Sequence, residues 1–198
     1  MKTTTYKLGE IATFIDYRGK TPIKTNSGIP LITAKIVKNG IIEPPTEFIN
    51  PKDYESWMTR GYPEVGDVVL TTEAPLGEVA QLKSKNVALA QRIITLRGNR
   101  KLLSNTYLKY FFISPKGQAL LRSRETGTTV IGIKSAELKE LEIDLPSLNE
   151  QEHIATILSM LDDKIANNVA INRNLEEQAR AIFKSWFIDF KPFRDGEF

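Results

Sequence analysis

The sequence predicts an α+β fold in which one globular domain of short strands and helices is followed by a single long α-helix. In residues 1–146, short apolar or β-branched runs alternate with glycine and proline turns. After Ser147, no residue that breaks a helix occurs until Pro192. The predicted domain boundaries are therefore 1–146 for the globular domain and 147–198 for the long helix.

The predicted elements of residues 1–146 are short and closely spaced. Residues 7–14 are typical of a short helix or strand, and residues 29–37 alternate like a strand that leads through Asn39-Gly40 into a hairpin. Further strands are expected over 65–74, 76–82, 86–90, 92–98 and 141–146. Helices are expected over 50–61, 104–114, 114–125 and 135–140, with Pro51 in the first turn of the first, and Ser104 and Ser114 opening the next two.

The composition is that of a folding, soluble chain, because 41% of its residues are hydrophobic and 26% are charged. The absence of cysteine excludes disulfides, thiolate zinc sites and cysteine nucleophiles. No apolar run approaches the ~20 residues that cross a bilayer, and the N-terminus lacks the apolar core of a signal peptide. We therefore expect a cytoplasmic protein without a membrane partner.

The positive charge lies in the first part of the chain. Residues 1–150 contain 21 lysines and arginines against 16 acidic residues, a net charge of +5, whereas residues 151–198 contain 6 against 8, a net charge of −2. Such an excess is compatible with a polyanionic partner, and also with a solvated basic surface that has no partner.

The long helix has a defined start and a regular apolar seam. Ser147 and Glu150 form a capping box, in which each side chain satisfies a backbone amide of the first turn. Spacings of four and three residues then predict five heptads, about 60 Å of helix, which is longer than one small domain covers. The seam consists of Ile154, Leu158, Leu161, Ile165, Asn168, Asn172, Leu175, Ala179, Ile182 and Trp186.

Asn168 and Asn172 interrupt this seam at its centre. If two copies pair antiparallel about a two-fold axis at residue 170, Asn168 of one copy meets Asn172 of the other, and Ile154 meets Trp186. A buried pair of this kind fixes the register of the two helices at a cost in stability. Such a dimer would present one surface twice, which on DNA gives a gapped palindromic site. The alternative is a helix that lies on its own domain with both asparagines in water.

Several stretches together resemble one family, the DNA-specificity subunits of type I restriction-modification enzymes. The matching stretches are KLGEIA, GIPLITAKIVKNG, GDVVLTTEAPLGEVA, SNTYLKYFFIS, TGTTVIGIKSAELKELEIDLPSLNEQEHIATIL and ARAIFKSWFIDFKPF. The most specific is the run LP-x-L-x-EQ-x-x-I from Leu145 to Ile154, which joins a target-recognition domain to a helix in that family. The resemblance covers nearly the whole chain.

The resemblance implies a non-catalytic subunit that binds double-stranded DNA and carries methyltransferase and restriction subunits. In this family, full-size members contain two recognition domains that alternate with two helices. This chain has one of each, so it resembles a half-size form, either naturally short or shortened. A homodimer would supply the missing half. The sequence agrees with this interpretation, because it contains no phosphate-binding loop, no dinucleotide fingerprint and no metal-ligand cluster. We therefore expect no cofactor and no metal, and we place the single histidine, His153, on the helix surface.

Three loops combine side chains suited to base edges with side chains suited to phosphates. Each loop has an alternative role as a plain connecting turn, and Lys35 also has an alternative role as cover for apolar surface. The candidate DNA-binding residues are Arg18, Lys20, Thr21 and Lys24 in the first loop, Glu73, Gln91 and Arg92 in the second, Thr128, Thr129 and Lys134 in the third, and Lys35.

Two other functions remain open from the sequence. A DNA-binding dimer that acts alone, as a regulator or competitor, would lack the methyltransferase subunit that a specificity subunit carries. A nuclease would need a cluster of acidic, histidine or lysine side chains, and no such cluster is evident in the sequence.

Overall fold

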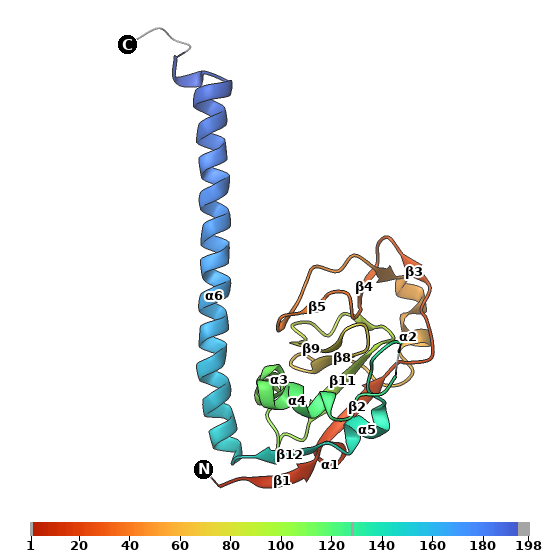
Figure 1. Ribbon diagram of the computed structural model, residues 1–198. Helices are drawn as coiled ribbons and strands as arrows, with labels where there is room; N and C mark the ends of the chain where they lie inside the picture. Colours follow the sequence, from red (N-terminus) through yellow and green to blue (C-terminus); the bar gives the residue numbers. More distant parts are fainter. Residues whose placement is uncertain (1, 128, 194–198) are drawn as a thin grey trace. The chain divides into compact units, whose positions relative to one another are not determined.

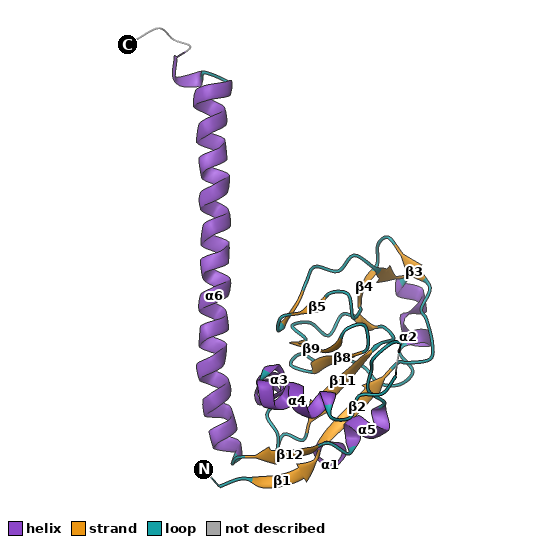
Figure 2. Ribbon diagram, viewed as in Figure 1, coloured by secondary structure: helices purple, strands orange, loops and turns teal. Residues whose placement is uncertain are grey.

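A computed structural model describes residues 2–127 and 129–193. The chain divides into two compact units, residues 1–155 and residues 156–198. The first unit contains strands and short helices, and the second contains most of one long helix (Figures 1 and 2). The predicted α+β class is confirmed. The division falls within the helix rather than before it, because the first two helical turns pack on the first unit.

A four-stranded antiparallel sheet forms the centre of the first unit. Its strands are β2 (Ala12–Asp16), β11 (Ile93–Gly98), β8 (Val68–Thr72) and β9 (Leu76–Gln81), in that order. Alternate residues of β8 and β11 point to opposite faces, and both faces are apolar. The sheet is therefore covered on both sides.

Four helices cover one face of this sheet. Val68, Leu70, Ile94 and Leu96 pack there in one core with apolar residues of the helices. The helices are α1 (Leu8–Ile11), α3 (Asn105–Ile113), α4 (Pro115–Arg122) and α5 (Ser135–Lys139). The Ser104 and Ser114 hydroxyls accept from the amides of Tyr107 and Gly117, so both predicted N-caps are confirmed.

A second, smaller sheet and a hairpin lie against the other face, where Val69, Ile93 and Ala80 contribute to a separate core. The sheet contains β10 (Ala88–Leu89), β4 (Ile29–Ile32), β7 (Phe48–Ile49) and β3 (Lys24–Thr25). The hairpin joins β5 (Val37–Lys38) to β6 (Ile41–Ile42) through Asn39 and Gly40, whose φ angles are 51° and 84°. The predicted hairpin is thus confirmed.

Two predicted elements were longer than the elements that the structure contains. The predicted strand over 29–37 is split after Ile32, where the Ile36 amide bonds to the Thr33 carbonyl at 3.2 Å in a turn. The helix predicted over 50–61 is a 3-10 turn (Pro51–Asp53) followed by α2 (Tyr54–Trp57). The Trp57 indole donates to the Leu89 carbonyl at 3.0 Å, so a tertiary contact fixes the end of this short helix.

The ends of the first unit are joined by β1 (Thr4–Lys7) and β12 (Glu142–Leu145), which pair antiparallel with Thr4 opposite Leu145. The long helix α6 (Leu148–Phe183) follows directly. The predicted capping box is present, because the Glu150 carboxylate accepts from the Ser147 amide at 3.0 Å and the Ser147 hydroxyl accepts from the Glu150 amide at 3.4 Å.

Gln151 fixes the start of α6 to the first unit. Its side chain is only 1% exposed. The amide nitrogen donates to the carbonyls of Leu102 and Pro146 at 2.9 and 3.0 Å, and the amide oxygen accepts from the Ser104 amide at 3.0 Å. The sequence motif that contains Gln151 therefore caps the helix and also anchors it.

The far end of the helix differs from the uninterrupted α-helix that we predicted up to Pro192. After Phe183 the chain forms a π-helical turn (Lys184–Ile188), which the Asp189 amide closes on the Lys184 carbonyl at 2.8 Å. A 3-10 turn (Lys191–Phe193) follows. A π turn adds a residue to the repeat, so Trp186 does not continue the α-helical seam at the predicted angle.

Candidate nucleic-acid interface

The second and third predicted loops meet at the end of β8, around Thr72 and Glu73. The Thr72 amide donates to the Arg92 carbonyl at 2.9 Å, and the Ile133 amide donates to the Thr72 carbonyl at 2.9 Å. Glu73 forms a β-bridge with Gly132. A register shift between β8 and β9 lies between Leu70 and Thr72, a place where a bulge redirects the chain. These contacts hold two segments far apart in sequence at one edge of the unit.

Glu73 and Arg92 face one another at this edge. Nε of Arg92 lies 3.0 Å from Oε1 of Glu73, and the two side chains are 56% and 39% exposed. Arg92 has a φ of 70°, and Ala74 in the same turn has a φ of 49°. Residues other than glycine occupy this left-handed region at a cost, and they gather at binding and active sites.

Arg18 connects the first loop to the same edge. Its guanidinium bonds to both carboxylate oxygens of Asp16, with Nε to Oδ1 at 2.9 Å and Nη2 to Oδ2 at 2.7 Å. Its Nη1 donates to the Ile133 carbonyl at 3.2 Å. Burial raises the pKa of the Asp16 carboxyl, but the hydrogen bonds from Arg18 outweigh burial and leave that pKa below its ordinary value.

The third loop is a closed turn. The Thr126 amide donates to the Gly132 carbonyl at 2.7 Å, and the Gly132 amide returns a bond to the Thr126 carbonyl at 3.0 Å. Gly127 has a φ of 106°, a conformation that L residues rarely adopt. Thr129 is exposed in this turn. The other candidate, Thr128, lies outside the described residues.

The lysines near this edge are exposed. Lys134 occupies the N-cap position of α5 without a side-chain capping bond, and Lys20 lies in the first loop beside Thr21. Within residues 2–127 and 129–193, neither lysine is paired with a carboxylate. Gln91 is half-buried directly before Arg92. The structure thus brings Arg18, Glu73, Gln91, Arg92 and Lys134 near one another, and whether they contact DNA stays a prediction.

Lys24 and Lys35 form a separate cluster. Both pair with Glu47, at 2.9 and 3.4 Å, in the region of the smaller sheet. The hydrogen bond from Lys24 lowers the pKa of the Glu47 carboxyl below its ordinary value. Both lysines therefore pair with a carboxylate beside the smaller sheet, and we separate them from the edge formed by the three loops.

Arg60 was missed by the sequence analysis. Its Nη1 donates to the carbonyls of Asp16 and Arg18, both at 2.9 Å, and so holds the backbone of the first loop. The Arg60 amide also bonds to the buried Tyr17 hydroxyl at 2.8 Å. No local pattern reveals this role, because 42 residues separate Arg60 from Arg18.

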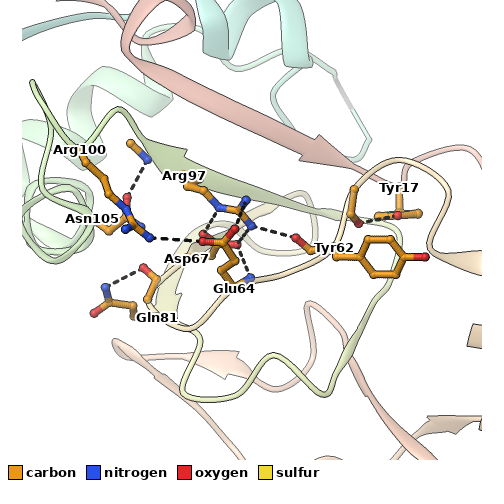
Figure 3. Close-up of polar contacts among 11 residues, drawn as sticks. Tyr17, Tyr62, Glu64, Asp67, Gln81, Arg97, Arg100 and Asn105 are labelled. Carbon is orange, nitrogen blue, oxygen red and sulfur yellow. Dashed lines mark hydrogen bonds and ion pairs between the residues drawn. The ribbon is translucent and has the colours of Figure 1, made fainter. Parts of the chain in front are cut away.

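A second polar network lies at the opposite end of β8 and β11 (Figure 3). The Asp67 carboxylate is 1% exposed and accepts from Nε and Nη2 of Arg97 at 2.8 and 2.7 Å. Arg97 also pairs with Glu64 at 2.8 Å, and Glu64 pairs with Arg100 at 3.5 Å. This network satisfies a buried charge and stabilises the sheet; it contains none of the predicted DNA-binding residues.

No group of three or more histidine, cysteine, aspartate or glutamate side chains suited to a metal ion occurs in residues 2–127 and 129–193. In the same part of the chain, no helix combines the length and apolar character needed to span a bilayer.

Comparison with known proteins identifies the family. The family model described as the type I restriction modification DNA specificity domain matches residues 2–177. The chain belongs to this family. The resemblance inferred from the sequence motifs is therefore confirmed.

The most informative relatives of this specificity domain are archaeal and bacterial. The type I restriction enzyme MjaIX specificity subunit of Methanocaldococcus jannaschii is 36% identical over 96% of this chain and 44% of its own length. The HindI specificity subunit of Haemophilus influenzae is 38% identical over 47% of this chain and 18% of its own. This chain thus spans less than half the length of the curated relatives that it matches.

Solved structures confirm the fold of the specificity domain. The type I restriction-modification S subunit from M. genitalium covers 96% of this chain and 48% of its own, with a TM-score of 0.64 and 20% identity. The HsdS subunit from Thermoanaerobacter tengcongensis covers 93% of this chain and 44% of its own, with a TM-score of 0.60 and 18% identity.

Proposed function

We propose that this chain is a non-catalytic, half-size specificity subunit that reads DNA with the edge formed by its three loops. The observation that carries the proposal is the meeting of the second and third predicted loops on Thr72 and Glu73, to which Arg18 joins the first loop through the Ile133 carbonyl. Family membership supports DNA as the ligand. We also propose a cytoplasmic location, because the proposed ligand is DNA.

The side chains at this edge suit both parts of DNA recognition. Arginine and lysine bond to guanine, glutamine to adenine and glutamate to cytosine, all in the major groove. Lys134, Lys20, Thr21 and Thr129 are exposed and have the chemistry that contacts phosphate oxygens. We assign base contacts to Arg92, Glu73 and Gln91, and phosphate contacts to the other four.

We further propose that two copies pair antiparallel through α6. The seam residues Leu161, Ile165, Leu175 and Ile182 are between 55% and 61% exposed, an apolar stripe that is costly to leave in water. Asn168 and Asn172 are exposed at its centre and would pair with each other across the two-fold axis. Ile154 and Leu158 are already half-buried, so the partner helix would complete their cover.

Antiparallel pairing gives each dimer two reading edges related by symmetry. Because α6 begins at the first unit, the two first units would lie toward opposite ends of the paired helices, which extend roughly 54 Å for 36 residues. The target would then be two half-sites related by dyad symmetry and separated by an unread gap. The outer surface of the paired helices would carry the methyltransferase and restriction subunits.

Two measurements test this proposal. Light scattering on the purified chain should give twice the mass of 22.3 kDa at micromolar concentration. Selection from a randomised library of double-stranded DNA should enrich a gapped palindrome. A monomer at high concentration contradicts the dimer, and the absence of any enriched sequence contradicts the DNA-reading function.

Co-purification decides between the specificity subunit and the DNA-binding dimer that acts alone. We expect a methyltransferase subunit to bind the dimer and to remain bound through size exclusion. Persistent absence of such a complex, together with sequence-specific DNA binding, would favour the stand-alone dimer.

A further inference from the structure

Arg18 and Arg92 are the two arginines of the three loops, and they differ in which donors remain available. An arginine reads guanine by directing two N–H groups of its planar guanidinium to O6 and N7 of the base. An arginine whose three nitrogens all bond to protein acceptors keeps fewer N–H groups for a base and is held in place by those bonds. The contacts of each guanidinium therefore indicate whether it can read a base.

All three guanidinium nitrogens of Arg18 bond to protein acceptors, which uses three of its five N–H groups. Nε and Nη2 form a bidentate pair with Asp16 at 2.9 and 2.7 Å, and Nη1 reaches the Ile133 carbonyl at 3.2 Å. The side chain is also 30% exposed, which is little for an arginine on a loop. Arg18 is therefore a positioning residue that joins the first loop to the third.

Arg92 keeps its outer edge available. Glu73 contacts it through Nε, at 3.0 Å, which is the inner nitrogen of the guanidinium. Among residues 2–127 and 129–193, no acceptor bonds to Nη1 or Nη2 of Arg92. Those two nitrogens are left for an acceptor pair outside the protein, and the Glu73 carboxylate limits the rotation of the side chain.

The backbone of Arg92 is also fixed. Its carbonyl accepts from the Thr72 amide at 2.9 Å, and its φ of 70° is maintained by this contact and by the strand β11 that begins at Ile93. A base reader needs this kind of preorganisation, because a mobile side chain loses entropy when it binds.

We propose that Arg92, oriented by Glu73, reads a guanine in the major groove, so that each half-site contains a G·C pair whose recognition depends on this residue. The inference rests on the proposed function, and it names the specificity-determining residue of the same edge. Arg18 positions the loops and contributes no base preference.

The test is selection of the full chain and its variants on a randomised library of double-stranded DNA, followed by affinity measurement on the enriched duplex. For the wild-type chain, replacing the critical G·C pair should weaken binding roughly 10- to 100-fold per half-site. In Arg92→Ala, binding should become indifferent to the base at this position, while the preferences at the other positions persist.

Three variants serve as controls. Arg92→Asn keeps a residue that tolerates a positive φ, and it should also lose the guanine preference while folding normally by circular dichroism. Arg100→Ala removes an exposed arginine past the other end of β11 and should leave the enriched sequence unchanged. Arg18→Ala should weaken binding to all sequences alike.

The outcomes separate the two proposals. A wild-type chain that enriches no sequence overturns the proposed function and this inference with it. If the wild-type chain enriches a sequence, and Arg92→Ala and Arg92→Asn enrich the same sequence with the guanine retained, only the assignment of Arg92 is overturned. Loss of the guanine preference in Arg18→Ala, but in neither Arg92 variant, would also overturn it.

Discussion

Residue type alone does not determine what an arginine does in this protein. Arg18 and Arg92 were equal candidates in the sequence, yet one bonds to Asp16 and Ile133 through all three nitrogens and the other keeps Nη1 and Nη2 available. The difference arises from the acceptors that the fold brings near each guanidinium. We therefore expect substitutions at the two positions to change different measurements.

Arg18→Ala should destabilise the first unit in a pH-dependent way. The folded pKa of Asp16 lies below its ordinary value of 3.8, so this pair contributes stability above about pH 4 and loses it as the pH falls through the lower folded pKa. The variant should lose about 2 kcal/mol at pH 7 and distinctly less at pH 3. Urea unfolding at both pH values measures the difference.

Lys20→Ala is the matched control for this experiment, since Lys20 lies in the same loop, is exposed and has no carboxylate partner among the described residues. Its free energy of unfolding should follow that of the wild type at every pH. An Arg18→Ala deficit that is equal at pH 7 and pH 3 would contradict the role given to the Asp16 pair.

Gln151→Leu should cost about 3 kcal/mol of unfolding free energy. The substitution leaves the Ser104 amide and the carbonyls of Leu102 and Pro146 without their bonds in a buried place. The exposed neighbour Asn149 is the control, and Asn149→Ala should change stability by less than about 0.5 kcal/mol. Denaturant unfolding compares the two, and equal stabilities would remove Gln151 as the anchor of α6.

At the scale of elements, the central sheet separates two kinds of polar site. The turn after β8 and the start of β11 carry Glu73 and Arg92, which are partly exposed. The opposite ends of the same strands carry Asp67 and Arg97 (Figure 3). The Asp67 carboxylate is buried and bonded to the Arg97 guanidinium. Antiparallel pairing of β8 with β11 explains this division, since it brings the end of one strand to the start of the other.

In the long helix too, the burial of a side chain depends on its position along the element. Its first turns are anchored through Gln151 and Ala155, whereas its apolar seam from Leu161 to Ile182 is exposed in a single chain. Interhelical packing would contribute the stability that such a seam lacks in water. The π turn at Lys184–Ile188 marks where the regular heptad spacing stops.

Replacing both Asn168 and Asn172 by leucine should strengthen the dimer and loosen its orientation. Leucine at both positions removes the cost of buried amides, but it also removes the contact that favours one register. Sedimentation should show a lower dissociation constant, and energy transfer between labels at one end of the helix should reveal a mixture of parallel and antiparallel pairs.

Asn167→Leu, which lies off the seam and is exposed, provides the control for this change. It should alter neither the dissociation constant nor the orientation. If the double variant also behaves like the wild type in both measurements, the seam is assigned to the wrong face of α6.

At the scale of the whole molecule, symmetry should double the effect of each DNA contact. The logarithm of the binding constant falls linearly with the logarithm of salt concentration, with a slope of about −0.9 for each phosphate neutralised. A dimer carries Lys134 twice, so Lys134→Ala should reduce the magnitude of this slope by about 2 rather than about 1. Titration of the enriched duplex at several salt concentrations measures the slope.

Lys52 is exposed and lies outside the three loops, so Lys52→Ala should leave the slope unchanged. A change of about 1 for Lys134→Ala would indicate a single reading unit on the DNA, and no change would remove Lys134 from the phosphate contacts.

Much of the fold was predictable because the relevant signals are local. Ser104, Ser114 and Ser147 each precede a helix and cap it as their positions suggested, and Asn39-Gly40 forms the expected hairpin turn. Capping and turn formation involve residues two to four positions apart, so the sequence pattern contains all the participants. The split strand after Ile32 and the π turn after Phe183 were not predicted, because the pattern of apolar and polar residues does not reveal the backbone bonds that close them, from Ile36 to Thr33 and from Asp189 to Lys184.

The sequence by itself determined the α+β class, the capped start of the long helix, the spacing of its seam and the three loops that carry the candidate residues. Only the tertiary structure decided which of those residues act together. It bonded Arg18 to an acceptor 115 residues away, placed Arg92 against Glu73, and paired Lys24 and Lys35 with Glu47, apart from the other candidates. The physical reason is that helix caps and heptads depend on neighbours along the chain, whereas the donors left to a side chain depend on acceptors that only folding brings within reach.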